Sequence, residues 1–286
     1  IIACAKFISH YEIKESIKLI KNYGYRVVLN SKVFNKENIF AGSVQQRVDL
    51  LQGALDNLQT KAIFFARGGY GTIQILDFIN FTKFQKKPKW LIGFSDLTIL
   101  LTHVQIMYNI KSMHAPMLYN FNVCETGVIK RLFELLEGNR QHIELRSHNL
   151  NKLGVAKGKI IGGNLSILYS LMGSESLSII NNEYILFIED VDEYLYHLER
   201  MMYSLDRANI LKNLKGLIVG QMTNMLDNEI TFGKDKNTII YDVVKKYNYP
   251  ICFNFPVGHF SDNHPIIVGE KVELLVNKEK SRLRYI

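Results

Sequence analysis

The sequence predicts an α/β protein with an N-terminal, mostly parallel sheet flanked by helices and a C-terminal, strand-rich α/β domain. Over about the first 120 residues, short apolar runs alternate with helical patterns, which is typical of parallel strands covered on both faces. A polar stretch from Glu137 to Lys157 follows, and strand patterns dominate the end of the chain. We therefore place an N-terminal domain at residues 1–140, a linker at 141–156 and a C-terminal domain at 157–286.

The first half contains strand and helix patterns in alternation. Apolar runs predict strands, the last of them a strand or loop, at 1–8, 25–30, 61–66, 89–94 and 111–117. Helical periodicity predicts helices between them at 12–24, 45–58, 72–79 and 96–109. Ligand sites in such sheets lie beyond the carboxyl ends of the strands. Two motifs, at residues 66–72 and 93–98, occupy those positions.

The second half begins at the segment GKIIGGNLSILYSLMG and contains further apolar runs at 184–189 and 216–222. The run before Glu189 predicts a buried strand, and a helix is expected around residues 239–248. The final segments, 250–260 and 265–277, have mostly strand character. Internal repeats and low-complexity stretches are absent from the sequence.

Composition narrows the functional classes. With 286 residues, 47% of them hydrophobic, the chain can bury a sizeable core. Its net charge of +8 comes from scattered lysines, which predicts a solvated surface and no nucleic-acid partner. The three cysteines form no C-x-x-C pair, and apolar runs fall short of the roughly 20 residues that span a bilayer. We expect a reduced, cytoplasmic protein without a membrane partner. The sequence starts at Ile1 and not at a methionine.

The first motif is the glycine-rich turn ARGGYGT at residues 66–72, between a predicted strand and a predicted helix. Glycines free the backbone to turn tightly and to present N–H groups to a ligand. The motif lacks the spacing of a dinucleotide fingerprint or a P-loop. Either a structural turn or a phosphate cradle is compatible with the residues alone.

The second motif, GFSDLT at residues 93–98, places Ser95 between an apolar strand and a helix. Such a turn exposes a serine hydroxyl and lets the N–H of Asp96 point at a developing oxyanion. Alternatively, Ser95 or Asp96 is an N-cap that satisfies free N–H groups of the first helical turn. The sequence alone leaves both interpretations open.

A nucleophilic serine needs a base and a group that orients the base. His259 follows an apolar strand and a glycine, and Glu189 ends the apolar run ILFI. A carboxylate emerging from a buried strand is costly unless it is paired, and an imidazolium would pair it. The acidic residues after Glu189 could instead bind a metal, but neither zinc nor calcium spacing is present, so we expect no metal.

Six motifs together resemble the LD-carboxypeptidases, a family of serine peptidases that includes microcin-immunity peptidases. They occur in the family's order and cover nearly the whole chain: RGGYG at 67–71, GFSD at 93–96, HAPM at 114–117, GGNLSIL at 162–168, FIEDVDEYLYHLERMM at 187–202 and FPVGH at 255–259. The first strand departs from the family pattern, because it lacks the proline common near its end.

The resemblance implies a catalytic triad of Ser95 as nucleophile, His259 as general base and then acid, and Glu189 orienting His259. It implies an oxyanion hole from the N–H groups of Asp96 and Gly69. The implied reaction is hydrolysis of the L,D-peptide bond before the terminal D-alanine of murein tetrapeptide, through an acyl-enzyme, in cell-wall (peptidoglycan) recycling.

The resemblance further implies a muramoyltetrapeptide carboxypeptidase that acts as a homodimer, with no metal or organic cofactor. Asn164 is a candidate for a hydrogen bond to substrate or, equally, a turn residue before a helix. Glu193 competes with Glu189 for the role of the acid. Two other functions stay open: a related serine peptidase acting on acyl-adenylate conjugates, and a non-catalytic peptide-binding module.

Overall fold

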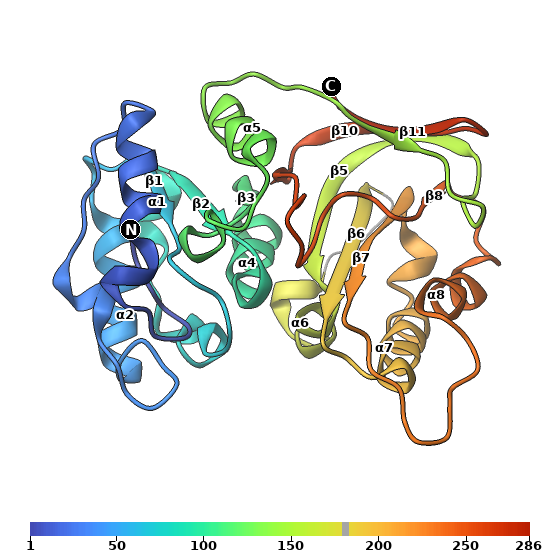
Figure 1. Cartoon of the computed structure of the whole chain (residues 1–286), viewed down its shortest axis with the longest axis horizontal. Coiled ribbons are helices and arrows are strands. Elements are labelled where there is room, and N and C mark those ends of the chain that lie inside the picture. Colours follow the sequence, from blue (N-terminus) through green and yellow to red (C-terminus); the bar gives the residue numbers. More distant parts are fainter. Residues whose placement is uncertain (179–182) are drawn as a thin grey trace.

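The computed structural model describes residues 1–178 and 183–286. It confirms the α/β class, with one sheet built largely from the first half of the chain and a larger sheet built from the second. Figure 1 shows the two sheets side by side, the blue-to-green elements on one side and the yellow-to-red elements on the other.

The first sheet has four strands in the order β1-β2-β3-β9. Strands β1 (Ala62–Phe64), β2 (Trp90–Gly93) and β3 (Ser112–His114) are parallel, and β9 (Ile266–Val268) joins them antiparallel. The predicted, mostly parallel sheet is therefore present. Its last strand comes from the far end of the chain.

The second sheet has seven strands in the order β4-β11-β10-β5-β6-β7-β8. One half is parallel and comprises β5 (Gly154–Asn164), β6 (Tyr184–Val191), β7 (Gly216–Thr223) and β8 (Ile251–Cys252). The other half is antiparallel and adds β4 (Ile143–Arg146), β10 (Lys271–Val276) and β11 (Lys280–Tyr285).

Helices pack against both sheets. They are α1 (His10–Asn22), α2 (Val44–Asp56), α3 (Thr82–Lys86), α4 (Thr98–Tyr108), α5 (Thr126–Leu136), α6 (Leu165–Ser170), α7 (Leu195–Arg207) and α8 (Lys236–Val244). Capping boxes start two of them, because Ser9 pairs with Glu12 before α1 and Ser43 pairs with Gln46 before α2. The sequence analysis did not include α5.

Two predicted strands are wrong. Residues 1–8 form isolated bridges, one of them between Ile2 and Phe65, and no strand of their own. Residues 25–30 form no strand either, although Val27 and Leu29 pack partly buried against the core. The apolar character of these segments therefore reports side-chain burial, while their backbones make only isolated contacts, such as the bridge from Ile2 to Phe65 and the bond from the Ile1 amino group to the Val28 carbonyl.

The predicted helix at 72–79 is also wrong, because this segment forms the short 3₁₀ turns η2 (Thr72–Gln74) and η3 (Leu76–Phe78). Gly71 precedes them at a φ of 132°. The Thr72 N–H donates to the Asp96 carboxylate, 2.9 Å away. That bond ties the first of these turns to the residue that follows Ser95.

The chain crosses between the sheets more often than the predicted linker implies. Residues 141–156 contain β4 and the beginning of β5, and β9 returns to the first sheet. The domain limits at 1–140, 141–156 and 157–286 stay a prediction.

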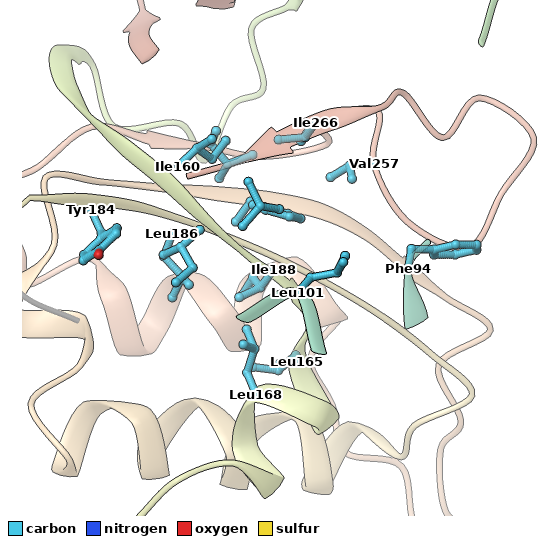
Figure 2. Packing of buried hydrophobic residues seen from close by; sticks show 14 of the residues in the cluster. Phe94, Leu101, Ile160, Leu165, Leu168, Tyr184, Leu186, Ile188, Val257 and Ile266 are labelled. Carbon is cyan, nitrogen blue, oxygen red and sulfur yellow. The ribbon is translucent and has the colours of Figure 1, made fainter. Parts of the chain in front are cut away.

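The contact between the two halves is apolar and continuous. One buried cluster includes Phe94 after β2, Leu101 of α4, Ile188 of β6 and Val257 near the site (Figure 2). Hydrophobic burial across this contact holds the sheets in register with each other.

None of the helices in the part of the chain that the structure describes is long and apolar enough to cross a membrane.

The close approach of β5 and β6 generates a stability prediction. A Cβ on Gly162 would lie 1.8 Å from the Phe187 carbonyl oxygen, and the Gly162 φ is 144°. We expect Gly162→Ala to lower the free energy of unfolding by about 3 kcal/mol or more. Gly127→Ala, whose Cβ meets nothing within 4 Å, is the control and should change it by less than about 1 kcal/mol. Urea denaturation measures both, and equal effects would contradict the packing described here.

Candidate active site

Ser95 lies on a strained turn between β2 and α4. The chain leaves β2 at Gly93, and Phe94 is still extended with a φ of −153°. Ser95 then adopts a φ of 62°, a region that L-residues other than asparagine and aspartate rarely occupy. The short 3₁₀ helix η4 (Ser95–Leu97) leads from there into α4. Such strain persists only where surrounding packing holds it, and it clusters at functional sites.

The hydroxyl of Ser95 is turned toward a histidine. Ser95 Oγ lies 3.0 Å from His259 Nε2, and no side-chain cap bond is present at the start of η4. Asp96 is fully buried, and its carboxylate accepts the Thr72 N–H. Burial raises the pKa of Asp96 although that hydrogen bond opposes the shift. The N-cap alternative for Ser95 and Asp96 is therefore not what the structure shows.

The glycine-rich turn is packed directly against the serine. A Cβ on Gly68 would lie 3.1 Å from Ser95 Cβ and 3.3 Å from Ser95 Oγ. Gly69, at a φ of 109°, is packed on the Lys6 stem instead. Gly68, the first glycine of the RGGYG motif, is thus the one packed on the Ser95 side chain. The oxyanion role of Gly69 and Asp96 stays a prediction.

His259 and Glu189 are in direct contact. His259 Nδ1 lies 2.7 Å from Glu189 Oε2, and the Glu189 side chain is completely buried. Burial alone would lower the pKa of His259, but the adjacent Glu189 charge and hydrogen bond outweigh it and raise that pKa. The structure therefore brings together the three predicted residues. Ser95 contacts His259, and His259 contacts Glu189.

The loop before His259 needs a glycine. Gly258 has a φ of 133°, and a Cβ there would lie 3.1 Å from Glu189 Cβ. Its N–H donates to Asn263 Oδ1 over 2.9 Å. This loop places the His259 imidazole at hydrogen-bond distance from the Glu189 carboxylate.

Glu193 does not contact His259. Its carboxylate lies 2.6 Å from His197 Nδ1, one helical turn away. Asp190, next to Glu189, is also buried, and burial together with the Glu189 charge raises its pKa to about 7. Of the two candidate acids, Glu189 is thus the one that faces His259.

Asn164 is buried between α6 and β6. Its Oδ1 accepts the Ile167 N–H as the N-cap of α6, and its Nδ2 donates to Asp190 Oδ1 over 2.8 Å. Both ends of the amide are therefore engaged within the protein. The substrate role of Asn164 stays a prediction, and the turn interpretation describes its contacts.

A cavity of about 240 Å³ adjoins the imidazole. Its lining comes from the segments after β2, before α5 and around His259: Phe94, Asn120, Val123, Cys124, His259, Phe260, Ser261 and Asn263. Among the described residues, no group of three or more His, Cys, Asp or Glu side chains is placed to hold a metal ion. The arrangement can activate a serine hydroxyl by proton transfer to an oriented imidazole.

Comparison with known proteins places this geometry in a family. The LD-carboxypeptidase N-terminal domain matches residues 1–115, and the LD-carboxypeptidase C-terminal domain matches residues 157–274. The chain belongs to the LD-carboxypeptidase family. The resemblance carried by the six motifs is thereby confirmed.

Individual LD-carboxypeptidase relatives match over nearly their full length. The murein tetrapeptide carboxypeptidase of Pseudomonas aeruginosa is 26% identical over 296 residues, covering 100% of this chain and 94% of that protein. A Bacillus subtilis protein named probable murein peptide carboxypeptidase is 27% identical over 265 residues, covering 91% and 82%.

Solved structures agree on the fold. The muramoyltetrapeptide carboxypeptidase of Oxalobacter formigenes superposes with a TM-score of 0.90 at 26% identity, covering 99% of this chain and 97% of that one. The microcin C7 self-immunity protein MccF, in complex with adenosine monophosphate, has a TM-score of 0.86 at 17% identity, covering 99% and 94%. The MccF likeness is one of fold.

The strain at Ser95 generates a second prediction. Glycine occupies positive φ without steric cost, whereas alanine at this position keeps the strain of serine. Both substitutions remove the contact with His259 Nε2. We therefore expect Ser95→Gly to have a free energy of unfolding about 1 kcal/mol higher than Ser95→Ala. Thermal or urea denaturation of the pair measures this, and a glycine variant no more stable than the alanine variant would argue against backbone strain at the turn.

Proposed function

We propose that this LD-carboxypeptidase family member is a serine carboxypeptidase that hydrolyses the L,D-peptide bond before the terminal D-alanine of murein tetrapeptide. One observation carries the proposal: the unbroken contact from Ser95 Oγ through the His259 imidazole to Glu189 Oε2. Relatives that match nearly the whole chain are named for murein peptide substrates, which supports the choice of substrate.

The first half of the reaction follows from the three side chains. His259 Nε2 takes the Ser95 proton as Oγ attacks the carbonyl carbon of the bond before D-alanine. The N–H groups of Asp96 and Gly69 are the proposed donors to the resulting oxyanion. His259 then protonates the amine of the leaving D-alanine, so that the C–N bond breaks and an ester to Ser95 remains.

The second half repeats the proton transfers with water. His259 removes a proton from a water molecule that attacks the ester, and returns it to Ser95 Oγ as the shortened peptide leaves. Glu189 holds the imidazole in the tautomer that presents Nε2 to the serine, and it stabilises the imidazolium in each step. The complete burial of Glu189 strengthens this interaction because water does not screen it.

The remaining features of the proposal come from the family resemblance. We propose a cytoplasmic homodimer that acts in cell-wall recycling, with Asn164 near the substrate and no cofactor. The two domains would then carry the nucleophile on one side of the site and the acid and base on the other.

The third prediction tests the proposed function. Purified protein should release D-alanine from murein tetrapeptide with a metal chelator present throughout, and Ser95→Ala should lower that rate by roughly 10⁴-fold or more. Ser170→Ala is the matched control, since Ser170 is exposed on α6 and its hydroxyl bonds the Ile167 carbonyl. Its rate should equal that of the wild type.

Failure of the wild-type protein to release D-alanine would refute the proposed substrate. Cleavage of an acyl-adenylate conjugate by the same preparation would then identify the related microcin-type activity. Binding of peptide without cleavage of either substrate would identify a binding module. Equal rates for the wild type and Ser95→Ala would refute the proposed nucleophile.

A further inference from the structure

His114, in the HAPM motif, is a buried histidine that the mechanism above does not use. It is the last residue of β3, where it pairs with Gly93 of β2 on one side and with Ile266 of β9 on the other. Its side chain is completely buried. A polar ring sealed inside the protein at this strand end requires a physical explanation.

His114 contacts two phenylalanine rings, Phe94 and Phe187, that lie near the Glu189 and His259 pair. Its ring centroid is 5.1 Å from that of Phe187 and 5.5 Å from that of Phe94. Phe187 precedes Glu189 by two residues on β6, so both side chains point to the same face of the sheet. Phe94 also contacts the His259 ring, with centroids 4.7 Å apart. His114 therefore lies near the Glu189 and His259 pair, and it is not one of the residues that line the cavity.

Three residues in this region bear buried polar atoms without a hydrogen-bond partner among the described residues. The atoms are Glu189 Oε1, both ring nitrogens of His114 and Asn263 Nδ2. A buried polar atom left unpaired costs about 1–3 kcal/mol, so each of these atoms needs a hydrogen-bond partner, either another of them or an ordered water. Asn263 is already fixed, because its Oδ1 accepts the Gly258 N–H.

The donors and acceptors of this group match. Burial lowers the pKa of His114 to about 4, although the nearby Glu189 charge opposes the shift, so the ring is neutral at physiological pH. A neutral imidazole offers one N–H donor and one bare nitrogen acceptor. Asn263 Nδ2 can supply the bare nitrogen with a donor, and Glu189 Oε1 can accept the imidazole N–H.

We propose that His114 is a positioning residue that fixes the Glu189 carboxylate by donating its N–H to Oε1, with Asn263 donating to the opposite ring nitrogen. The structure shows no direct hydrogen bond between His114 and Glu189 Oε1, so an ordered water bridges these two groups. The inference rests on the proposed function, since Glu189 matters only if it orients His259. When His114 holds Oε1, the other carboxylate oxygen, Oε2, stays at hydrogen-bond distance from His259 Nδ1.

The consequence of this arrangement is a measurable pKa. His259 is influenced by three carboxylates, Glu189 first and then the more weakly acting Asp190 and Asp192. Glu189 raises the pKa of His259 through its charge and through the hydrogen bond to Nδ1, and both contributions shrink when Oε2 moves away. Loss of the His114 donor would free the carboxylate to rotate, and the pKa of His259 would then fall.

The fourth prediction is a titration of His259 by NMR in the substrate-free protein, with the His259 signal assigned by its loss in His259→Asn. His114→Phe keeps the ring packing on Phe94 and Phe187 but removes both nitrogens. We expect it to lower the pKa of His259 by about one unit and to lower kcat for D-alanine release by about tenfold or more, with KM little changed. His114→Gln restores a donor and an acceptor and should recover most of both values.

His103→Phe is the matched control. It also removes an imidazole, but His103 is only partly buried and its Nδ1 contacts Ser176 instead of the active-site residues. It should leave the pKa of His259 unchanged. A folded His114→Phe variant with the wild-type His259 pKa, or with a higher one, would overturn the proposal. The titration requires no substrate, so it answers the question even if wild-type protein releases no D-alanine, an outcome that refutes the proposed function separately.

A crystal structure of the wild-type protein at atomic resolution gives a second test that does not depend on how the variants fold. The proposal expects a hydrogen-bonded path from a His114 nitrogen to Glu189 Oε1, direct or through one water. Absence of such a path would overturn it.

Discussion

The contact chain from Ser95 through His259 to Glu189 depends on two sheets that must stay in fixed relation to each other. Ser95 follows β2 of the first sheet, whereas Glu189 belongs to β6 of the second. A shift of about 1 Å between the sheets would break the 3.0 Å hydrogen bond between Ser95 Oγ and His259 Nε2. The continuous apolar cluster between the halves prevents that shift. It is reinforced where the Asn164 N–H donates to Thr98 Oγ1, at the first residue of α4.

The active site contains two unfavourable features that the surrounding packing must offset. Ser95 has an unfavourable backbone angle, and Glu189 is a carboxylate without solvent contact. Each is destabilising by itself, and each is held by neighbours that leave it no alternative. Gly68 and Gly258 contribute to this, because a Cβ at either position would lie tightly, at 3.1 Å, against the Cβ of Ser95 or Glu189.

Ser95 and His259 stand near strand ends beside glycines, and Glu189 ends an apolar run. These signals alone left other roles open, and the triad was predicted from the family resemblance. The glycine-rich pattern did not show that Gly68 packs on Ser95 and Gly69 on Lys6, because those contacts depend on tertiary packing. The spacing of the buried residues Ile75, Leu76 and Ile79 fits an α-helix as well as consecutive 3₁₀ turns, so it did not identify η2 and η3. Pairing of β9 with β3 was equally hidden, since a short apolar run does not specify its sheet.

The most direct test of the account is the covalent intermediate. Wild-type protein mixed with murein tetrapeptide, quenched in acid within milliseconds and digested, should yield a peptide containing Ser95 that carries the mass of the acyl tripeptide. The adduct should be absent from Ser95→Ala and should accumulate when water attack is slow. D-alanine release by wild-type protein with no adduct on Ser95, or with an adduct on another residue, would contradict the account.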